Sequence, residues 1–272
     1  MRRVLTAAVL IPLVIGLIFW GSNRSVRLAF AFLALLCLSE FLRLASRYGA
    51  QPMRLAAYLS GAWVVAAEPI VSIAGAYGPL PALLLDPGPA FFLFLALLLL
   101  VLAMLGGREL SASLPGAAAT LLGVIYTSIP FRMAADLHAL SPRWLFYVLI
   151  INWIGDAAAY YAGRAVGRRR LAPRVSPGKT WEGAAASLLT AAPLGTLYLR
   201  RFLPAGPGLL PALLLSIVVN AAAQVGDLAE SALKRGANVK DSGSLLPGHG
   251  GVLDRLDGLL FSVPVVWLAA GR

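Results

Sequence analysis

The chain has 272 residues, of which 59% are hydrophobic and 13% charged, and its mean hydropathy is +0.80. Soluble domains carry about 25% charged residues, so this composition excludes a water-exposed globular surface and predicts an integral membrane protein. The formal net charge is +11. In so apolar a chain, basic residues between spans set topology and contact anionic lipid headgroups. We therefore expect the lipid bilayer, and no nucleic acid, as the partner of these charges.

Apolar runs near the roughly 20 residues that cross a bilayer recur along the chain. The basic N-terminus resembles a signal peptide, but no small-residue cleavage pattern follows the first run, so an uncleaved helix is expected. The pattern predicts an all-α integral membrane protein with about nine transmembrane helices, over 4–20, 26–46, 55–76, 89–106, 112–131, 145–163, 183–200, 208–233 and 252–270.

Charge is distributed unevenly between the two sides of the membrane and along the chain. With a cytoplasmic N-terminus, 16 of the 23 basic residues fall in loops on the cytoplasmic side, as the positive-inside rule favours. We expect residues 1–140 to form an N-terminal scaffold of transmembrane helices and residues 141–272 a catalytic region. Its polar loops, 164–182 and 234–257, are expected on the cytoplasmic face, where nucleotides are found.

The segment 231–257 is unusually polar and reads SALKRGANVKDSGSLLPGHGGVLDRLD. Phosphoryl and nucleotidyl transfer need cations around the phosphates and carboxylates for a divalent metal. Glycine lets backbone N–H groups approach an anion, and Mg²⁺ prefers one or two carboxylates plus phosphate oxygens. Asp227, just upstream, shares a helix face with Ser231 and Lys234. We expect Asp227 to hold a metal with Asp254, Asp257 or both.

Simpler interpretations of these acids stay open. Asp254 and Asp257 are also suited to capping the last helix, because acids near a helix N-terminus favour its dipole. Asp241 is equally suited to an ordinary turn. These interpretations explain less well why 5 of the 12 acidic residues lie between Asp227 and Asp257.

A second polar block covers residues 152–182. Asp156 lies near the end of an apolar helix, a position that usually faces a protein interior or polar cavity. The arginines that follow are explained largely as a basic loop that sets the orientation of the chain in the membrane. The sequence SPGKT contains GKT, but Pro173 stands where a P-loop needs its first glycine, so that motif is excluded. All three lysines of the chain, 179, 234 and 240, lie in the two polar blocks. This placement is expected if their ammonium groups bind phosphate.

The segment 231–257 resembles the signature of the phosphatidate cytidylyltransferase (CDP-diacylglycerol synthase) family. The upstream segments GDAAAYYAGRAVGRRR, SPGKTWEG and QVGDLAES resemble the same family, and the resemblance is strong from about 150 to 260. The first 140 residues match only as hydrophobic spans. Every fixed position of the signature is met, thirteen in all: Ser231, Lys234, Arg235, Lys240, Asp241, Gly243, Pro247, His249, Gly250, Gly251, Asp254, Arg255 and Asp257.

The resemblance implies that CTP and phosphatidic acid react to CDP-diacylglycerol and pyrophosphate with Mg²⁺, at the cytoplasmic face of a bacterial-type inner membrane. It also implies a monovalent cation such as K⁺ and a homodimer. The expected metal ligands are Asp227, Asp254 and Asp257, and the expected catalytic residues are these three with Lys240 and Asp241. The expected substrate-binding residues are Asp156, Arg164, Ser176, Lys179, Ser231, Lys234, Arg235, His249, Gly250, Gly251 and Arg255; the role of His249 is open.

Three other functions are alternatives to cytidylyl transfer. A CTP-dependent polyprenol or phytol kinase needs a similar nucleotide site but phosphorylates a hydroxyl. A CDP-alcohol phosphotransferase is disfavoured because its DG-x2-AR array with further spaced aspartates is absent from the sequence. A transporter places charges at mid-helix, whereas the acids here gather at predicted helix ends beside basic loops.

Overall fold

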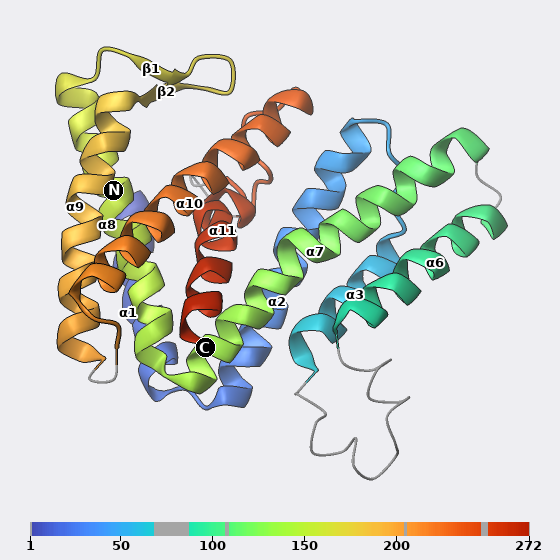
Figure 1. Cartoon of the computed structure of the whole chain (residues 1–272). Coiled ribbons are helices and arrows are strands. Elements are labelled where there is room, and N and C mark those ends of the chain that lie inside the picture. Colours follow the sequence, from blue (N-terminus) through green and yellow to red (C-terminus); the bar gives the residue numbers. More distant parts are fainter. Residues whose placement is uncertain (1, 68–86, 107–108, 204–205, 246–249, 272) are drawn as a thin grey trace, which may run out of the picture. The chain divides into compact units, whose positions relative to one another are not determined.

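The computed structural model describes residues 2–67, 87–106, 109–203, 206–245 and 250–271, with side chains from residue 11 onward. The described residues form helices and one short hairpin (Figure 1). In chain order the elements are α1 (Arg2–Trp20), α2 (Asn23–Arg47), α3 (Arg54–Ala66), α6 (Pro89–Leu105), α7 (Leu110–Leu140), α8 (Pro142–Val166), β1 (Arg170–Ala172), β2 (Ser176–Thr180), α9 (Trp181–Phe202), α10 (Leu209–Gly236) and α11 (Leu253–Ala270).

The helical membrane class is confirmed. Four helices, α2, α7, α8 and α10, are long and apolar enough to cross a bilayer. The helix predicted over 55–76 ends at Ala66 as α3, and its remainder from residue 68 lies outside the described residues. Helix α7 is longer than the predicted 112–131 and continues past Pro130 to Leu140. The count of nine transmembrane helices stays a prediction.

The chain divides into two compact units. One consists of Met1–Val26 with Met133–Arg272, and the other of Arg27–Arg132. The first unit contains α1 and everything from α8 to α11, so it holds all the predicted site residues. The functional division near residue 140, into scaffold and catalytic region, stays a prediction.

Within the first unit, α8 packs against α9, α10 and α11. Small residues permit this close approach, as in many membrane helix bundles. A Cβ added at Gly155 of α8 would lie 2.5 Å from Asn220 Nδ2 of α10. Buried polar side chains also join the helices: Asn152 Nδ2 donates to Ser262 Oγ at 2.9 Å, and Asn220 Nδ2 donates to Ser187 Oγ at 3.0 Å. These contacts join the helices that carry the polar site.

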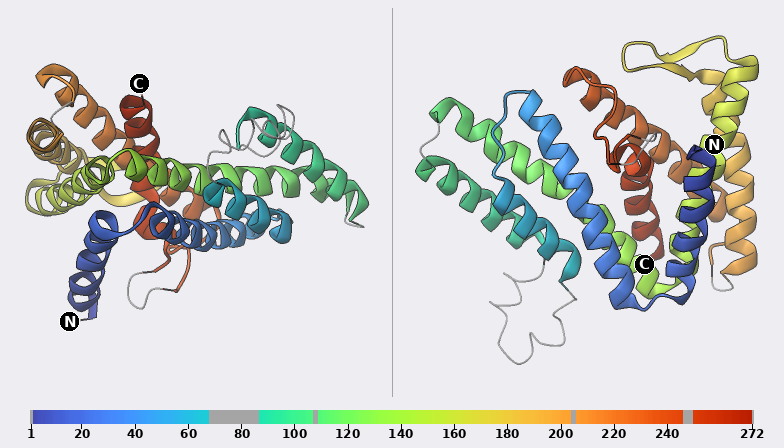
Figure 2. Two further views of the ribbon diagram at one scale, coloured as in Figure 1. Left: turned by 90° about the horizontal axis from the view of Figure 1, so that it is seen from below. Right: turned by 180° about the vertical axis from the view of Figure 1, so that it is seen from behind.

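The basic segment after α8 forms a hairpin, where the sequence predicted only a loop. Strands β1 and β2 are antiparallel, with Arg170 opposite Thr180. The hairpin extends beyond the ends of α8 and α9 (Figure 1 and the right-hand view of Figure 2). The Glu182 carboxylate accepts hydrogen bonds from the backbone N–H groups of Arg168 and Arg169 at 3.1 and 3.2 Å. Its own backbone N–H and these two donors lower the pKa of Glu182.

Candidate active site

Three carboxylates from three helices line one small cavity. Asp156 of α8, Asp227 of α10 and Asp257 of α11 surround a volume of about 60 Å³, together with Asn152 and Arg255. The backbones approach closely here, since a Cβ added at Gly226 would lie 2.6 Å from the Asp257 carbonyl oxygen. The structure therefore brings the two polar sequence blocks together in one site. It adds Asp156, predicted as a substrate-binding residue, to the carboxylates predicted as metal ligands.

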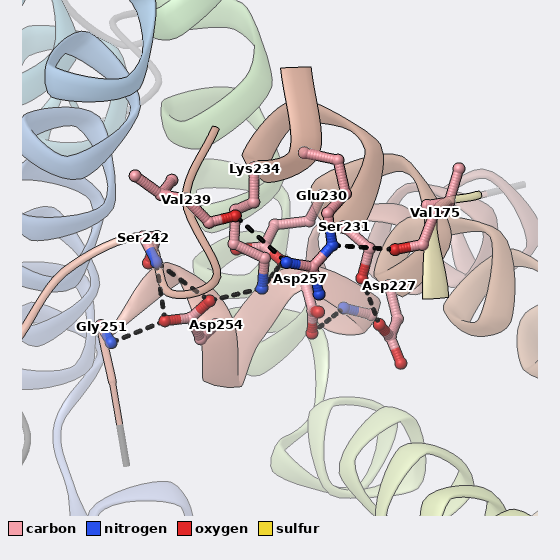
Figure 3. Close-up of polar contacts among 12 residues, drawn as sticks. Val175, Asp227, Glu230, Ser231, Lys234, Val239, Ser242, Gly251, Asp254 and Asp257 are labelled. Carbon is pink, nitrogen blue, oxygen red and sulfur yellow. Dashed lines mark hydrogen bonds and ion pairs between the residues drawn. The ribbon is translucent and has the colours of Figure 1, made fainter. Parts of the chain in front are cut away.

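Asp227 connects the cavity to the hairpin. Lys179 Nζ of β2 lies 2.6 Å from Asp227 Oδ2, and Ser231 Oγ donates to Asp227 Oδ1 at 3.4 Å (Figure 3). The hairpin is held a second time by Arg235, whose Nε donates to the carbonyl oxygen of Val175 at 3.2 Å. The first contact places Lys179, a hairpin residue predicted to meet substrate, beside the carboxylate cavity.

Asp254 has a different environment from the other acids, because its oxygens accept protein donors. Lys234 Nζ lies 2.6 Å from Oδ1, and the backbone N–H groups of Ser242 and Gly251 donate to Oδ2 at 3.0 and 2.7 Å (Figure 3). Asp254 thus links α10, the segment that follows it and the start of α11. It does not line the cavity that Asp227 and Asp257 share.

Lys234 has a second carboxylate partner that the sequence reasoning did not identify. Its ammonium also contacts Glu230 Oε2 one turn earlier in α10, and the Glu230 side chain is fully buried. Glu230 was counted among the clustered acids but received no role. Its i,i+4 spacing to Lys234 is the signal that would have paired them.

The glycine-rich segment requires glycine at Gly250. Its φ is +80°, a conformation that residues with a Cβ rarely adopt. An added Cβ would also lie 2.6 Å from Asp254 Oδ2 and 3.4 Å from Asp241 Oδ1. Gly251 contributes the N–H that Asp254 accepts. Pro247 and His249 lie outside the described residues.

The remaining predicted residues surround this arrangement at its edges. Arg164 Nη1 donates to Tyr160 Oη at 3.1 Å near the end of α8. Ser176 begins β2, and Lys240 and Asp241 are exposed in the segment after α10. That helix ends where Asn238 takes a positive φ of 56°, which satisfies its last carbonyl groups through the N–H of Asn238 and Val239.

The donor chemistry of the cavity fits a hard divalent cation. Mg²⁺ binds one or two carboxylates together with waters and substrate phosphate oxygens, and the cavity offers three carboxylates. Within the described ranges, no three or more His, Cys, Asp or Glu side chains are arranged so that they could hold a metal ion. A bound Mg²⁺ would need water or substrate oxygens beside these carboxylates.

The fold and the site define a helical membrane protein in which acidic side chains of α8, α10 and α11 meet a basic side chain of the hairpin. The expectation that the acids lie at helix ends holds for Asp254 and Asp257, whereas Asp156 and Asp227 lie inside α8 and α10. The chain belongs to the cytidylyltransferase family, which it matches over residues 1–271. Three relatives carry the name phosphatidate cytidylyltransferase. The protein of Haemophilus influenzae is 46% identical over 123 residues, which are 44% of this chain and 43% of the relative.

The other two relatives extend the matched region slightly. The Bacillus subtilis protein is 40% identical over 150 residues, 54% of this chain and 55% of its own length. The Pseudomonas aeruginosa protein is 40% identical over 149 residues, 49% of this chain and 55% of its own. The matches thus span about half the length of each of these relatives.

Proposed function

We propose that the chain transfers the cytidylyl group of CTP to phosphatidic acid, giving CDP-diacylglycerol and pyrophosphate. Family membership and the names of the relatives support this reaction class. The single observation that carries the proposal is the cavity lined by Asp156, Asp227 and Asp257, with Lys179 on the same Asp227 carboxylate. An acidic site flanked by cations and lined by three helices of a membrane protein suits a reaction between two phosphate-bearing substrates, one of them a lipid.

In the proposed step, a phosphate oxygen of phosphatidic acid attacks the α-phosphorus of CTP. A new P–O bond forms there, and the bond to the bridging oxygen of the β-phosphate breaks, so that pyrophosphate leaves with that electron pair. The nucleophile is already an anion and needs no strong general base. The barrier arises mainly from bringing polyanions together, and preorganised positive charge offsets it. We propose that Lys179, Arg235 and Lys240 supply such charge.

The carboxylates would hold Mg²⁺, which supplies charge neutralisation at the triphosphate when bound. Asp227 and Asp257 remain the proposed ligands, and Asp156 joins them because it lines the same cavity. For Asp254 we now favour a role in shaping the segment before α11, because its oxygens accept the Lys234, Ser242 and Gly251 donors. Arg164, Ser176, Ser231, Arg255 and the glycines stay proposed substrate contacts.

The setting of the reaction is also a proposal. The distribution of basic residues favours an inner membrane location with the site facing the cytoplasm. A monovalent cation such as K⁺ and a homodimer rest on the resemblance alone.

Isotope placement tests the reaction. Purified protein in detergent is supplied with phosphatidic acid, Mg²⁺ and CTP labelled at either the α- or the γ-phosphorus. Cytidylyl transfer puts the α-label in the lipid and the γ-label in pyrophosphate. Label from the γ-position in the lipid would instead identify a kinase that phosphorylates phosphatidic acid, and no labelled lipid from either nucleotide would refute the proposed transfer.

A further inference from the structure

Glu230 is a fully buried carboxylate with no assigned role. It lies in α10 between Asp227 of the cavity and Lys234, and its side chain has no exposed surface. Its carboxylate forms an ion pair with the Lys234 ammonium through Oε2. A buried charge of this kind is costly unless paired, so its presence beside the site needs a reason.

A chain of contacts leads from Glu230 to the glycine-rich segment. The Lys234 ammonium lies between Glu230 and Asp254, and it is 2.6 Å from Asp254 Oδ1. Asp254 in turn accepts the backbone N–H groups of Ser242 and Gly251. Figure 3 shows Asp254 joined to all three donors. Residues that are far apart in the sequence are therefore connected through one buried ammonium group.

We propose that Glu230 is a positioning residue that acts through Lys234 and Asp254 on the backbone of Ser242 and Gly251. A lysine ammonium sits on a flexible four-carbon stem, and one carboxylate leaves it free to rotate towards solvent or substrate phosphate. Contacts to two carboxylates, those of Glu230 and Asp254, hold it in place. With the ammonium fixed, Asp254 stays oriented towards the two N–H groups. The effect on turnover rests on the proposed function, whereas the effect on the backbone does not.

The competing explanation is that Glu230 only helps α10 to pack. Packing alone predicts that the neutral and nearly isosteric Glu230→Gln leaves the Ser242 and Gly251 amides as protected as before. Positioning predicts local loss of protection at these two amides, because Gln cannot hold an ammonium by charge. The two explanations therefore differ in a readout that does not require activity.

The experiment measures hydrogen exchange in full-length protein in detergent, in peptides that contain Ser242 and Gly251. Glu230→Gln should speed exchange there about tenfold, with α9 unchanged, and should lower kcat about 10- to 100-fold. Glu40→Gln is the control, since Glu40 of α2 is equally buried at 1% exposure; it should leave both amides unchanged. Unchanged exchange in Glu230→Gln would overturn the proposal, whatever happens to turnover.

A second comparison keeps the test decisive if Glu230→Gln does not fold. In Lys234→Met the proposed connection is already cut, so adding Glu230→Gln should change exchange at Ser242 and Gly251 less than about twofold. The double variant also removes the unpaired buried carboxylate and should be no less stable than Lys234→Met. A further large rise in exchange in the double variant would show that Glu230 acts by another route, and would overturn the proposal. If no variant and no parent protein transfers cytidylyl, the proposed function fails while the exchange result still stands.

Discussion

Lys179 Nζ lies 2.6 Å from Asp227 Oδ2, so one ion pair joins the β-hairpin to the carboxylate cavity lined by α8, α10 and α11. Neither partner is fully buried, and exposed pairs contribute little to stability, about 0 to 1 kcal/mol. The pair is therefore better explained by function than by stability. In the proposed reaction the ammonium group and a divalent cation both neutralise charge at this point.

Replacement of Lys179 should impair catalysis with little effect on folding. We expect Lys179→Met to lower kcat/KM for CTP or phosphatidic acid about 100-fold, because a charge that offsets phosphate repulsion is lost. Steady-state kinetics in detergent measure this. Arg174→Met is the control, since it removes an exposed positive charge from the same hairpin. Equal losses in the two variants would show that only the general charge of the hairpin matters.

Neutralising the cavity carboxylates should abolish turnover while the protein still inserts and folds. We expect Asp227→Asn and Asp257→Asn each to lower kcat about 100-fold or more, with a higher Mg²⁺ concentration for half-maximal rate. Glu109→Gln, at an exposed acid outside the site, should behave like the parent. Near-normal rates in both aspartate variants would eliminate the proposed metal ligands.

Gly250 should not tolerate alanine. A Cβ would be strained at φ +80° and would lie 2.6 Å from Asp254 Oδ2, so we expect Gly250→Ala to lower kcat strongly. Gly49→Ala separates the effect of backbone strain from that of the steric clash. Gly49 has φ +83°, but an added Cβ there meets nothing within 4 Å. Its cost should be about 1 kcal/mol of stability, measured by thermal unfolding, with normal turnover. Full activity in Gly250→Ala would contradict the assigned geometry.

Glu182 should keep the hairpin attached to α9. Its pKa is lowered by its own backbone N–H and those of Arg168 and Arg169. The ionised form is thus favoured in the folded state, and any stabilisation is present above the ordinary pKa and lost as pH falls through the lowered value. Glu182→Gln imitates the protonated form at neutral pH. We expect faster trypsin cleavage at Arg168, Arg169 and Arg170, with cleavage at Arg200 and Arg201 as an internal reference that stays unchanged.

Much of the architecture and of the site follows from local sequence patterns. The apolar runs located most helices. The polar segment 231–257 predicted Asp254 and Asp257 as site residues, and Asp227 was predicted from the helix face that it shares with Ser231 and Lys234. The hairpin was missed because strands of three and five residues leave little periodic signal among basic residues. Helix α7 was predicted to end at residue 131, whereas it continues to Leu140.

Long-range packing decides what the sequence could not. Asp156 and Asp257 share a cavity because close contacts at Gly226 and Gly258 bring α8, α10 and α11 together. Likewise, Asp254 looks equivalent to Asp257 in the sequence, since both lie in the first turns of one helix. Their environments differ because the segment before α11 folds back to place Ser242 and Gly251 on Asp254 alone.

The most direct test of the central claim is mass spectrometry of the lipid formed by purified protein from CTP and phosphatidic acid, with and without Mg²⁺. The account predicts CDP-diacylglycerol and an equal amount of pyrophosphate with Mg²⁺, and neither without it. Unchanged phosphatidic acid in the presence of Mg²⁺, or a lipid that has gained phosphate alone, would contradict it.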